Sequence, residues 1–156
     1  MSQLFKDIKK IVRDALKDID MYSDDAHAMV MRTGLAETGF RTLFQKRGPA
    51  LGFWQCEPNT AYDIIENYIL YRPQLKSKLL SYNIDSSTVI RVLKTDIAAQ
   101  AILCRLKYRR DSKPIPKWND VKGQAEYWKR VYNTELGKGT IEHFIDANKG
   151  YELNYG

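Results

Sequence analysis

The spacing of apolar residues is the feature that most limits how this chain can fold. Along residues 3–19, apolar side chains recur at steps of three and four, with lysine and aspartate between them. This period places one apolar stripe on a helix and leaves a charged face opposite. Residues 1–22 are therefore predicted to form an amphipathic N-terminal helix. It is expected to pack on the rest of the domain rather than on a membrane surface, because acidic residues share its polar face.

The same spacing continues along the chain and predicts an all-α fold. One helix is expected to start after the N-cap Ser23 and to end near Glu37. Further helices are expected over residues 59–69, 74–82, 86–109, 121–132 and 140–147. Glycine and proline break the pattern in residues 38–58 and 113–116. No strand pattern of convincing length occurs, although a minor β-hairpin within residues 39–55 is left open.

The length and composition favour one soluble domain. A chain of 156 residues can bury a real core but is short for two ordinary domains, so residues 1–156 are read as one. No stretch approaches the roughly 20 apolar residues that a membrane span requires. We expect a monomer without stable membrane insertion. The N-terminal residues lack the uninterrupted apolar centre of a secretory signal, so synthesis in the cytoplasm without a signal peptide is expected.

Few side chains are suited to a metal site. The cysteines are Cys56 and Cys104, and the histidines are His27 and His143. No histidine lies near a cysteine or a carboxylate at ligand spacing, so we expect no metal and no cofactor. His27 is expected to be a packed or surface residue. Cys56 lacks a neighbouring histidine that would make it a nucleophile.

The charge of the chain favours an anionic partner. A net charge of +6 and a pI near 9.2 suit nucleic acid, a membrane surface or an acidic polymer such as the bacterial wall. The basic residues are dispersed, and their densest clusters are Lys9–Lys10, Lys107 with Arg109–Arg110, and Lys129–Arg130. None belongs to a recognised nucleic-acid-binding module. Nucleic acid is therefore not expected as a partner.

Glu37 is the candidate for acid chemistry. It lies in an apolar setting near the end of a predicted helix, where burial and the helix dipole both disfavour an anion. Cleavage of a glycosidic bond needs a carboxylic acid that is kept protonated by such surroundings. Taken alone the signal is weak, because a glutamate at a helix end is usually a solvated surface residue.

Three short motifs strengthen this interpretation. They are Glu37-Thr38-Gly39-Phe40, then Gly52-Phe53-Trp54-Gln55 followed by Pro58 and Thr60-Ala61, and finally Val131-Tyr132-Asn133-Thr134 with Gly137. In type and order they resemble the lytic transglycosylase and goose-type lysozyme group. That group has an E-S-x-F motif, a G-L-M-Q motif followed by proline and T-A, and a later A-Y-N-A-G. The resemblance covers roughly residues 24–140. It departs from the group where Phe53-Trp54 replaces Leu-Met and where Glu135 replaces a small residue.

The resemblance implies a lysozyme-like fold and a role for each motif. Glu37 would be the catalytic acid, Gln55 would contact the sugar acetamido group, and Tyr132 with Asn133 would face Glu37. Phe53 and Trp54 would stack on sugar rings, with core packing as the competing interpretation. The substrate would be bacterial peptidoglycan, cut at the β-1,4 bond between N-acetylmuramic acid and N-acetylglucosamine without a cofactor. The implied setting is a bacteriophage lysis protein or a virion-associated lysin that acts on the wall.

Two reactions and two other functions stay open at this point. A lytic transglycosylase would use Glu37 alone and leave 1,6-anhydro ends, and this is the favoured prediction. A hydrolytic lysozyme would add a second carboxylate, for which Glu57 is the candidate, because an aspartate follows G-L-M-Q in goose-type lysozymes. The alternatives from other classes are a non-catalytic phage structural or wall-binding protein and a nucleic-acid-binding protein.

Overall fold

The computed structural model describes residues 2–42, 48–133 and 137–156. Within these ranges the chain is helical and has no β-strand, which confirms the all-α class. The elements are α1 (Gln3–Asp18), α2 (Asp24–Glu37), α3 (Pro58–Asn67), η1 (Ile69–Tyr71), α4 (Pro73–Leu80), α5 (Val89–Thr95), α6 (Ile97–Arg109), α7 (Val121–Tyr127), η2 (Trp128–Asn133) and α8 (Ile141–Asn148). None of the described helices is long and apolar enough to cross a membrane.

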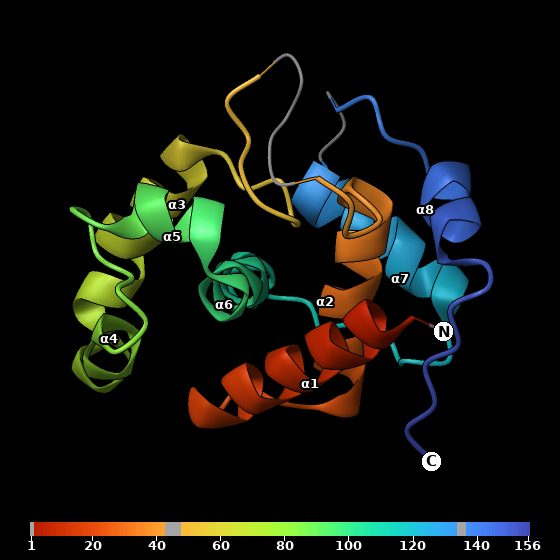
Figure 1. Cartoon of the computed structure of the whole chain (residues 1–156), viewed down its shortest axis with the longest axis horizontal. Helices are drawn as coiled ribbons and strands as arrows, with labels where there is room; N and C mark the ends of the chain where they lie inside the picture. Colours follow the sequence, from red (N-terminus) through yellow and green to blue (C-terminus); the bar gives the residue numbers. More distant parts are fainter. Residues whose placement is uncertain (1, 43–47, 134–136) are drawn as a thin grey trace.

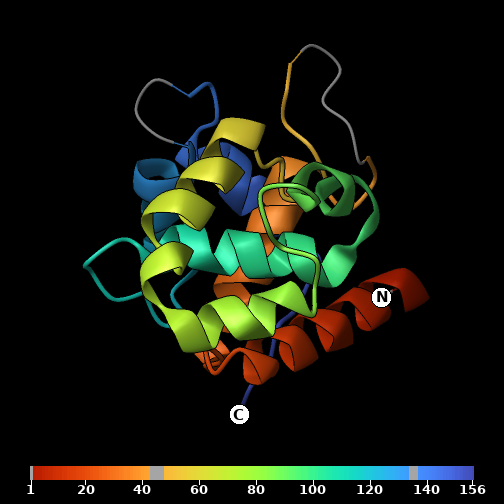
Figure 2. The same cartoon turned by 90° about the vertical axis from the view of Figure 1, so that its left-hand side faces the viewer.

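Helix α6 lies at the centre of the molecule (Figure 1). It packs against α1, α2, α3, α5 and η2. Its sequence fits that place, because small and apolar residues occupy both faces and are buried from Ala99 to Leu103. Helices α3, α4 and α5 lie on one side of α6, and α7 and α8 lie on the other (Figures 1 and 2).

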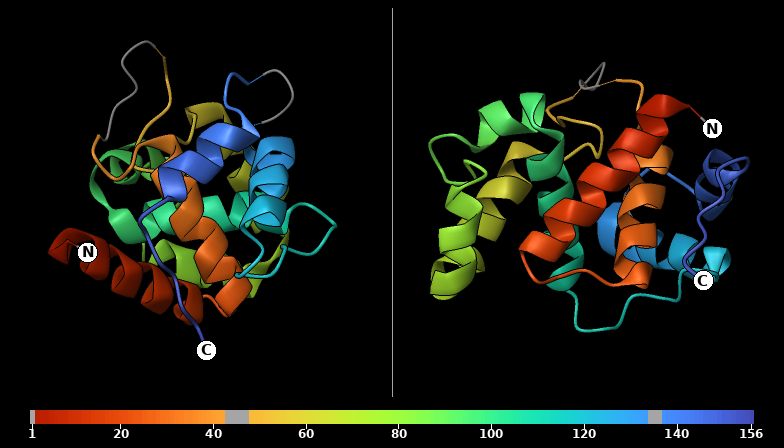
Figure 3. Two further views of the ribbon diagram at one scale, coloured as in Figure 1. Left: turned by 90° about the vertical axis from the view of Figure 1, so that its right-hand side faces the viewer. Right: turned by 60° about the horizontal axis from the view of Figure 1, so that its bottom comes forward.

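The amphipathic N-terminal helix is α1, which crosses α6 and α2 (Figure 3). The Ser2 hydroxyl accepts a hydrogen bond from the Phe5 backbone N–H and so caps its first turn. The apolar stripe, from Phe5 through Ile8 and Val12 to Leu16, is buried in the core. Burial of this stripe orders α1, because an isolated helix of this length is marginal in water.

Helix α2 is a core helix that ends at the surface. The Ser23 hydroxyl caps it by accepting from the Ala26 N–H, and every residue from Ala26 to Ala36 is buried. Gly34 is needed in this helix because a Cβ there would lie 2.2 Å from the Phe40 ring. The helix ends at Glu37, as the sequence predicted.

The prediction of one long helix over residues 86–109 is wrong. The chain breaks at Asp96, which adopts an extended conformation between α5 and α6. The Asp96 carboxylate accepts from the Ala99 backbone N–H at 3.1 Å and caps α6. An aspartate that caps a helix satisfies an end that would otherwise be unpaired, so it favours a new start over continuation.

The predicted helix over residues 121–132 is present but changes type. Ordinary α-helix ends at Tyr127, and the next turn, η2, is wider π-helix. Such π turns are uncommon and occur often at functional sites. Here the change of pitch sets the directions of Trp128, Tyr132 and Asn133.

The β-hairpin left open for residues 39–55 is reduced to a single β-bridge in the described part of this range. Leu51 and Cys56 form a single antiparallel bridge, with both backbone hydrogen bonds at 2.9 Å. Residues 43–47 of the predicted range lie outside the described residues. In the part that is described, the bridge closes a tight loop and does not extend into strands.

Candidate functional site

A cleft of about 710 Å³ is lined by the end of α2, the start of α3, the last turn of α6 and the end of η2. Five of the seven residues that the sequence singled out line it: Glu37, Gln55, Glu57, Tyr132 and Asn133. These residues come from three motifs that lie far apart in sequence. The fold therefore brings the three motifs to one cavity.

Glu37 is held at the edge of this cleft with one oxygen bound. Its Oε2 accepts a hydrogen bond from the indole Nε1–H of Trp128 at 2.9 Å, and the side chain is partly buried. Burial raises the pKa of Glu37 to about 7, against the lowering effects of the Trp128 bond and of the positive charges of Lys107 and His143. The protonated and the ionised form of this carboxyl group are therefore about equally populated near neutral pH.

Trp128 is the site residue that the sequence analysis missed. Its ring is 1% exposed and packs against Phe144 with ring centroids 5.3 Å apart, so its sequence signal was that of a core residue. Its one polar atom nevertheless faces Glu37. Gly139 allows the loop after η2 to approach, because a Cβ there would lie 2.5 Å from the Trp128 ring.

Lys107, which lines the cleft, and His143, which lies near Glu37, were also not predicted as site residues. Lys107 lies over the Tyr132 ring at 4.1 Å and donates to the Tyr132 backbone carbonyl at 2.9 Å. His143 bonds the Ala36 carbonyl through Nε2 at 2.7 Å, and this nitrogen must carry the proton because a carbonyl only accepts. Lys107 therefore places positive charge near Glu37, and both side chains tie backbone segments together.

Gln55 sits on the tight loop closed by the Leu51–Cys56 bridge. Its φ of 50° lies in the left-handed region, and its side chain Nε2 donates to the Gly52 carbonyl at 2.9 Å. A non-glycine residue held in this region is uncommon and is often found at functional sites. The buried Gln100 fixes the loop from below, since its Oε1 accepts from the Phe53 N–H at 3.0 Å. The Gln55 side chain is thereby held at the cleft wall.

Phe53 and Trp54 are placed differently from the expectation that they stack on sugar rings. Trp54 is 1% exposed, and its Nε1 donates to the Val30 carbonyl at 2.8 Å inside the core. Phe53 is partly buried and meets the Phe40 ring edge-on at 5.6 Å. Neither side chain lines the cleft, so the competing interpretation, core packing, describes both. Their contribution is to support the loop that carries Gln55.

Tyr132 lines the cleft but does not bond Glu37. Its hydroxyl donates to the Trp54 backbone carbonyl at 2.5 Å, and its ring is 7% exposed. The hydrogen-bond partner of Glu37 is Trp128, one turn earlier on the same element. Tyr132 therefore ties η2 to the loop of the second motif, and this bond keeps two walls of the cleft together.

Asn133 is fixed by a lysine on its own element. Its Oδ1 accepts from the Lys129 Nζ at 2.9 Å, and the same ammonium donates to the Gly137 carbonyl at 2.9 Å. A Cβ on Gly137 would lie 2.3 Å from the Asn133 carbonyl oxygen, so glycine permits this close return of the chain. Thr134, the remaining member of the third motif, lies outside the described residues.

Glu57 also lines the cleft, as the residue before α3. It is exposed and its side chain makes no capping hydrogen bond with the helix. Among the described residues it forms no ion pair with a lysine or arginine. It is therefore available to the cleft, in contrast to the partly buried and bonded Glu37.

The residues that could bind a metal ion are dispersed over the part of the chain that the structure describes. In the described ranges, no three His, Cys, Asp or Glu side chains are grouped so as to hold an ion. Cys56 and Cys104 are buried free thiols, and burial raises the pKa of Cys56 to about 12, so it is not a thiolate at neutral pH. The chemistry available in the cleft is that of carboxyl, amide, hydroxyl and ammonium groups.

Comparisons with protein-family models, with curated proteins and with solved structures found no match for this chain. Its function is therefore inferred from the three motifs and from the geometry of the cleft.

Proposed function

We propose that this protein cleaves the β-1,4 bond between N-acetylmuramic acid and N-acetylglucosamine in peptidoglycan, with Glu37 as the acid. The observation that carries the proposal is the state of Glu37: a partly buried carboxyl on a cleft wall, with a pKa of about 7 and one oxygen bonded to Trp128. An ordinary surface glutamate is ionised at neutral pH and could not donate a proton. The lysozyme-like fold implied by the motifs is part of the same proposal.

The reaction follows from a single carboxyl group. Glu37 donates its proton to the glycosidic oxygen as the bond from that oxygen to the muramic C1 breaks, and Lys107 and Trp128 stabilise the carboxylate that results. The carboxylate then takes the proton of the muramic 6-hydroxyl while that oxygen bonds to C1. The product carries a 1,6-anhydro end, no water is consumed, and Glu37 is protonated again.

Gln55 and Asn133 are the proposed sugar-binding groups. Their amide side chains lie on two walls of the cleft, and amides can both donate to and accept from an acetamido group. Both are held by hydrogen bonds to their own loops, Gln55 to Gly52 and Asn133 to Lys129. Such pre-organisation reduces the entropy that ligand binding would otherwise cost.

Hydrolysis is the second candidate reaction, and the position of Glu57 favours it. This carboxylate lines the same cleft as Glu37 and is not committed to the cap of α3. A second carboxylate can activate water on the far face of a sugar ring. The enzyme would then leave reducing ends and would be a muramidase.

Mass analysis of peptidoglycan fragments tests the proposal. Digestion of purified, insoluble peptidoglycan by the parent protein is expected to release fragments with 1,6-anhydromuramic ends, and the Glu37→Gln protein is expected to release none. Fragments with reducing ends would establish the muramidase instead. If a folded parent protein releases no fragments, the enzymatic proposal is wrong, and a non-catalytic wall-binding or structural role takes its place.

A further inference from the structure

Three smaller cavities continue from the cleft around the C-terminal end of α6. The first, of about 540 Å³, shares Thr60 and Lys107 with the cleft. The second, of about 310 Å³, shares Arg110 with the first, and the third, of about 290 Å³, shares Arg109 with the second. We call these three adjoining cavities the basic groove. They contain the cluster of Lys107 and Arg109–Arg110, of which the proposed chemistry uses only Lys107.

The basic groove holds more positive charge than its carboxylates neutralise. Arg110 is paired with Asp63. Arg72, by contrast, lies over the Tyr68 ring at 3.7 Å, and Arg109 is exposed. In the ranges that the structure describes, no ion pair joins a carboxylate to Arg72, Arg105 or Arg109.

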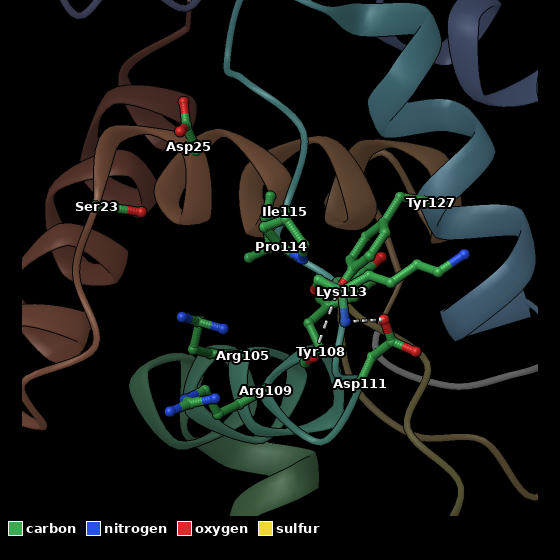
Figure 4. Close-up of a pocket in the computed structure, with 10 residues that line it drawn as sticks. All are labelled: Ser23, Asp25, Arg105, Tyr108, Arg109, Asp111, Lys113, Pro114, Ile115 and Tyr127. Carbon is green, nitrogen blue, oxygen red and sulfur yellow. Dashed lines mark hydrogen bonds between the residues drawn. The ribbon is translucent and has the colours of Figure 1, made fainter.

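Arg105 and Arg109 form the clearest part of this excess. They project side by side from α6, one turn apart (Figure 4). The Nε of Arg105 donates to the Met21 carbonyl at 3.0 Å, and within the described chain its two terminal nitrogens donate no hydrogen bond. Burial lowers the pKa of Arg105, and the neighbouring charge of Arg109 lowers it further. Like charges one turn apart repel, so this pair is unfavourable unless an anion joins it.

The carboxylates that line the same cavity already accept hydrogen bonds from other residues. The Asp25 carboxylate accepts from the Trp118 backbone N–H at 2.7 Å. The Asp111 carboxylate forms two hydrogen bonds with Arg130, at 3.0 and 3.1 Å. Neither bonds the arginine pair, which is therefore free to receive oxygen atoms from a ligand.

A purely structural role explains only part of this arrangement. Basic residues in the last turn of a helix interact favourably with its dipole, which accounts for Lys107 and Arg109. It does not account for Arg72, which precedes α4, or for the unused nitrogens of Arg105. The planar guanidinium with several donors is suited to carboxylate and phosphate oxygens.

The aromatic residues of the groove do not favour nucleic acid. Proteins that bind single strands stack bases on exposed aromatic faces. Here Tyr108 and Tyr127 are 1% and 5% exposed and stack on each other, and Arg72 covers Tyr68. Charge without a stacking surface fits a polymer whose acidic groups lie on flexible side branches.

We propose that the basic groove binds the acidic peptides of the same peptidoglycan strand whose sugar bond lies at Glu37, with Arg105 and Arg109 bonded to a peptide carboxylate. The inference rests on the proposed function, since it extends that substrate beyond the cleft. The shared lining residues carry it: Thr60 and Lys107 line both the cleft and the first cavity, and Arg110 and Arg109 link that cavity to the one that holds the arginine pair. The branches of a strand in the cleft would then reach these arginines.

Binding to insoluble peptidoglycan, freed of wall phosphate polymers, tests the groove without cleavage. All proteins carry Glu37→Gln and are sedimented with the polymer at low and high salt. Arg105→Gln with Arg109→Gln is compared with Lys6→Gln and Lys122→Gln, two exposed lysines of α1 and α7 that give the same net charge. The groove variant is expected to bind at least about tenfold more weakly at low salt, because charge-assisted hydrogen bonds are lost, and the control should bind as its parent does.

Binding to peptide-free glycan strands and to single-stranded DNA tests the alternative ligands. On strands stripped of their peptides, the difference between groove variant and control should vanish. Equal binding of variant and control to intact peptidoglycan overturns the proposal, as does a difference that persists without the peptides or tighter binding of DNA that depends on the arginines. If Arg105→Gln does not fold, Arg109→Gln alone is compared with Lys6→Gln.

The two proposals fail separately. An intact parent protein that releases no peptidoglycan fragments refutes the proposed cleavage, whereas the sedimentation comparison uses inactive protein and decides on the groove alone.

Discussion

The two halves of α2 each hold a titratable side chain, His27 fully buried and Glu37 partly buried, and their surroundings differ. His27 is completely buried, and both ring nitrogens are bonded: Nε2 to the Lys9 carbonyl at 2.9 Å and Nδ1 to the Tyr155 hydroxyl at 2.5 Å. Glu37, ten residues later, has one oxygen bonded to Trp128 and lines a cleft. Burial favours the neutral form of each, lowering the pKa of His27 to about 4 and raising that of Glu37 to about 7.

The difference separates a structural group from a chemical one. The Lys9 carbonyl can only accept, so Nε2 of His27 carries the proton and Nδ1 accepts from Tyr155. That ring has no nitrogen left for a ligand, and it joins α2 to α1 through Lys9 and to the C-terminal residues through Tyr155. Glu37 lies against a cavity and has a pKa near neutrality. A shifted pKa thus indicates function only where the group also has access to a ligand.

The largest expected effect is the loss of activity in Glu37→Gln. The amide keeps the shape and can still accept from Trp128, but it cannot donate the proton to the leaving oxygen. We expect peptidoglycan cleavage to fall by at least about 100-fold, with helical circular dichroism unchanged. The release of soluble fragments over time measures this. A variant that keeps more than about a tenth of the parent rate contradicts the role of Glu37.

His27→Ala should have the converse result. The substitution removes a buried ring and leaves the Lys9 carbonyl and the Tyr155 hydroxyl without their partner. The free energy of unfolding is expected to fall by about 2–4 kcal/mol, measured by urea denaturation, while activity per folded molecule stays at the parent level. Loss of activity in protein that is still folded would mean that the two halves of α2 are not independent.

The sequence predicted the position of Glu37 better than it predicted the contacts around this residue. Motif order and helix period placed Glu37 at a helix end beside Gln55, Tyr132 and Asn133. The indole bond to Glu37 spans 91 residues, and no local pattern specifies such a contact. For Trp54 the sequence offered two roles that need the same residue type, since both sugar stacking and core packing favour an aromatic ring.

The helix pattern likewise did not predict where the helix over residues 86–109 breaks. Period and apolar character continue through residues 86–109, so the break at Asp96 had no signal except the residue type itself. An aspartate within an apolar run can be a solvated helix residue or a cap, and tertiary packing decides which one forms. His27 was read as packed or at the surface, and its partner Tyr155 lies 128 residues away.

The difference in stability between Glu37→Gln and the parent protein should depend on pH. The folded pKa of Glu37 is raised, so the folded protein binds more protons than the unfolded chain between pH 4.5 and about 7, and stability falls as pH rises through this window. Glutamine is neutral at every pH and avoids this loss. Above pH 7 the variant is expected to be more stable than the parent by about 2 kcal/mol, with little difference near pH 4, measured by denaturation in matched buffers.

His27 gives the opposite window, which serves as the internal control. Its folded pKa is lowered, so stability that is present above pH 6.5 is lost as pH falls towards 4. This loss occurs equally in the parent and in Glu37→Gln. A parent and variant that differ by the same amount at all pH values would show that Glu37 is ionised in the folded protein, contrary to its proposed state.

Trp128→Phe is expected to have an intermediate effect. The phenyl ring keeps most of the packing against Phe144 but removes the N–H that favours the ionised form of Glu37. The pKa of Glu37 should rise, so the fall in activity towards high pH should move to higher pH, and the maximal rate should drop by about tenfold. The pH profile of cleavage separates this from a packing defect, which would lower the rate without moving the profile.

The smallest expected effect is that of Glu57→Gln, and its size decides between the two reactions. Glu57 is exposed and lines the same cleft as Glu37. Its negative charge near the start of α3 is favourable for the helix dipole whether or not it takes part in catalysis. If Glu37 acts alone, the variant should keep its anhydro products and lose less than about threefold in rate, since no proton passes through residue 57. A muramidase would instead give reducing ends, and its rate would fall by about 100-fold or more, the size expected for a missing acid–base partner.

Product mass and rate are measured on the same digest, so the two results check each other. A large loss of rate with anhydro products would show that Glu57 binds the strand, because a single-carboxyl reaction has no step for it to catalyse.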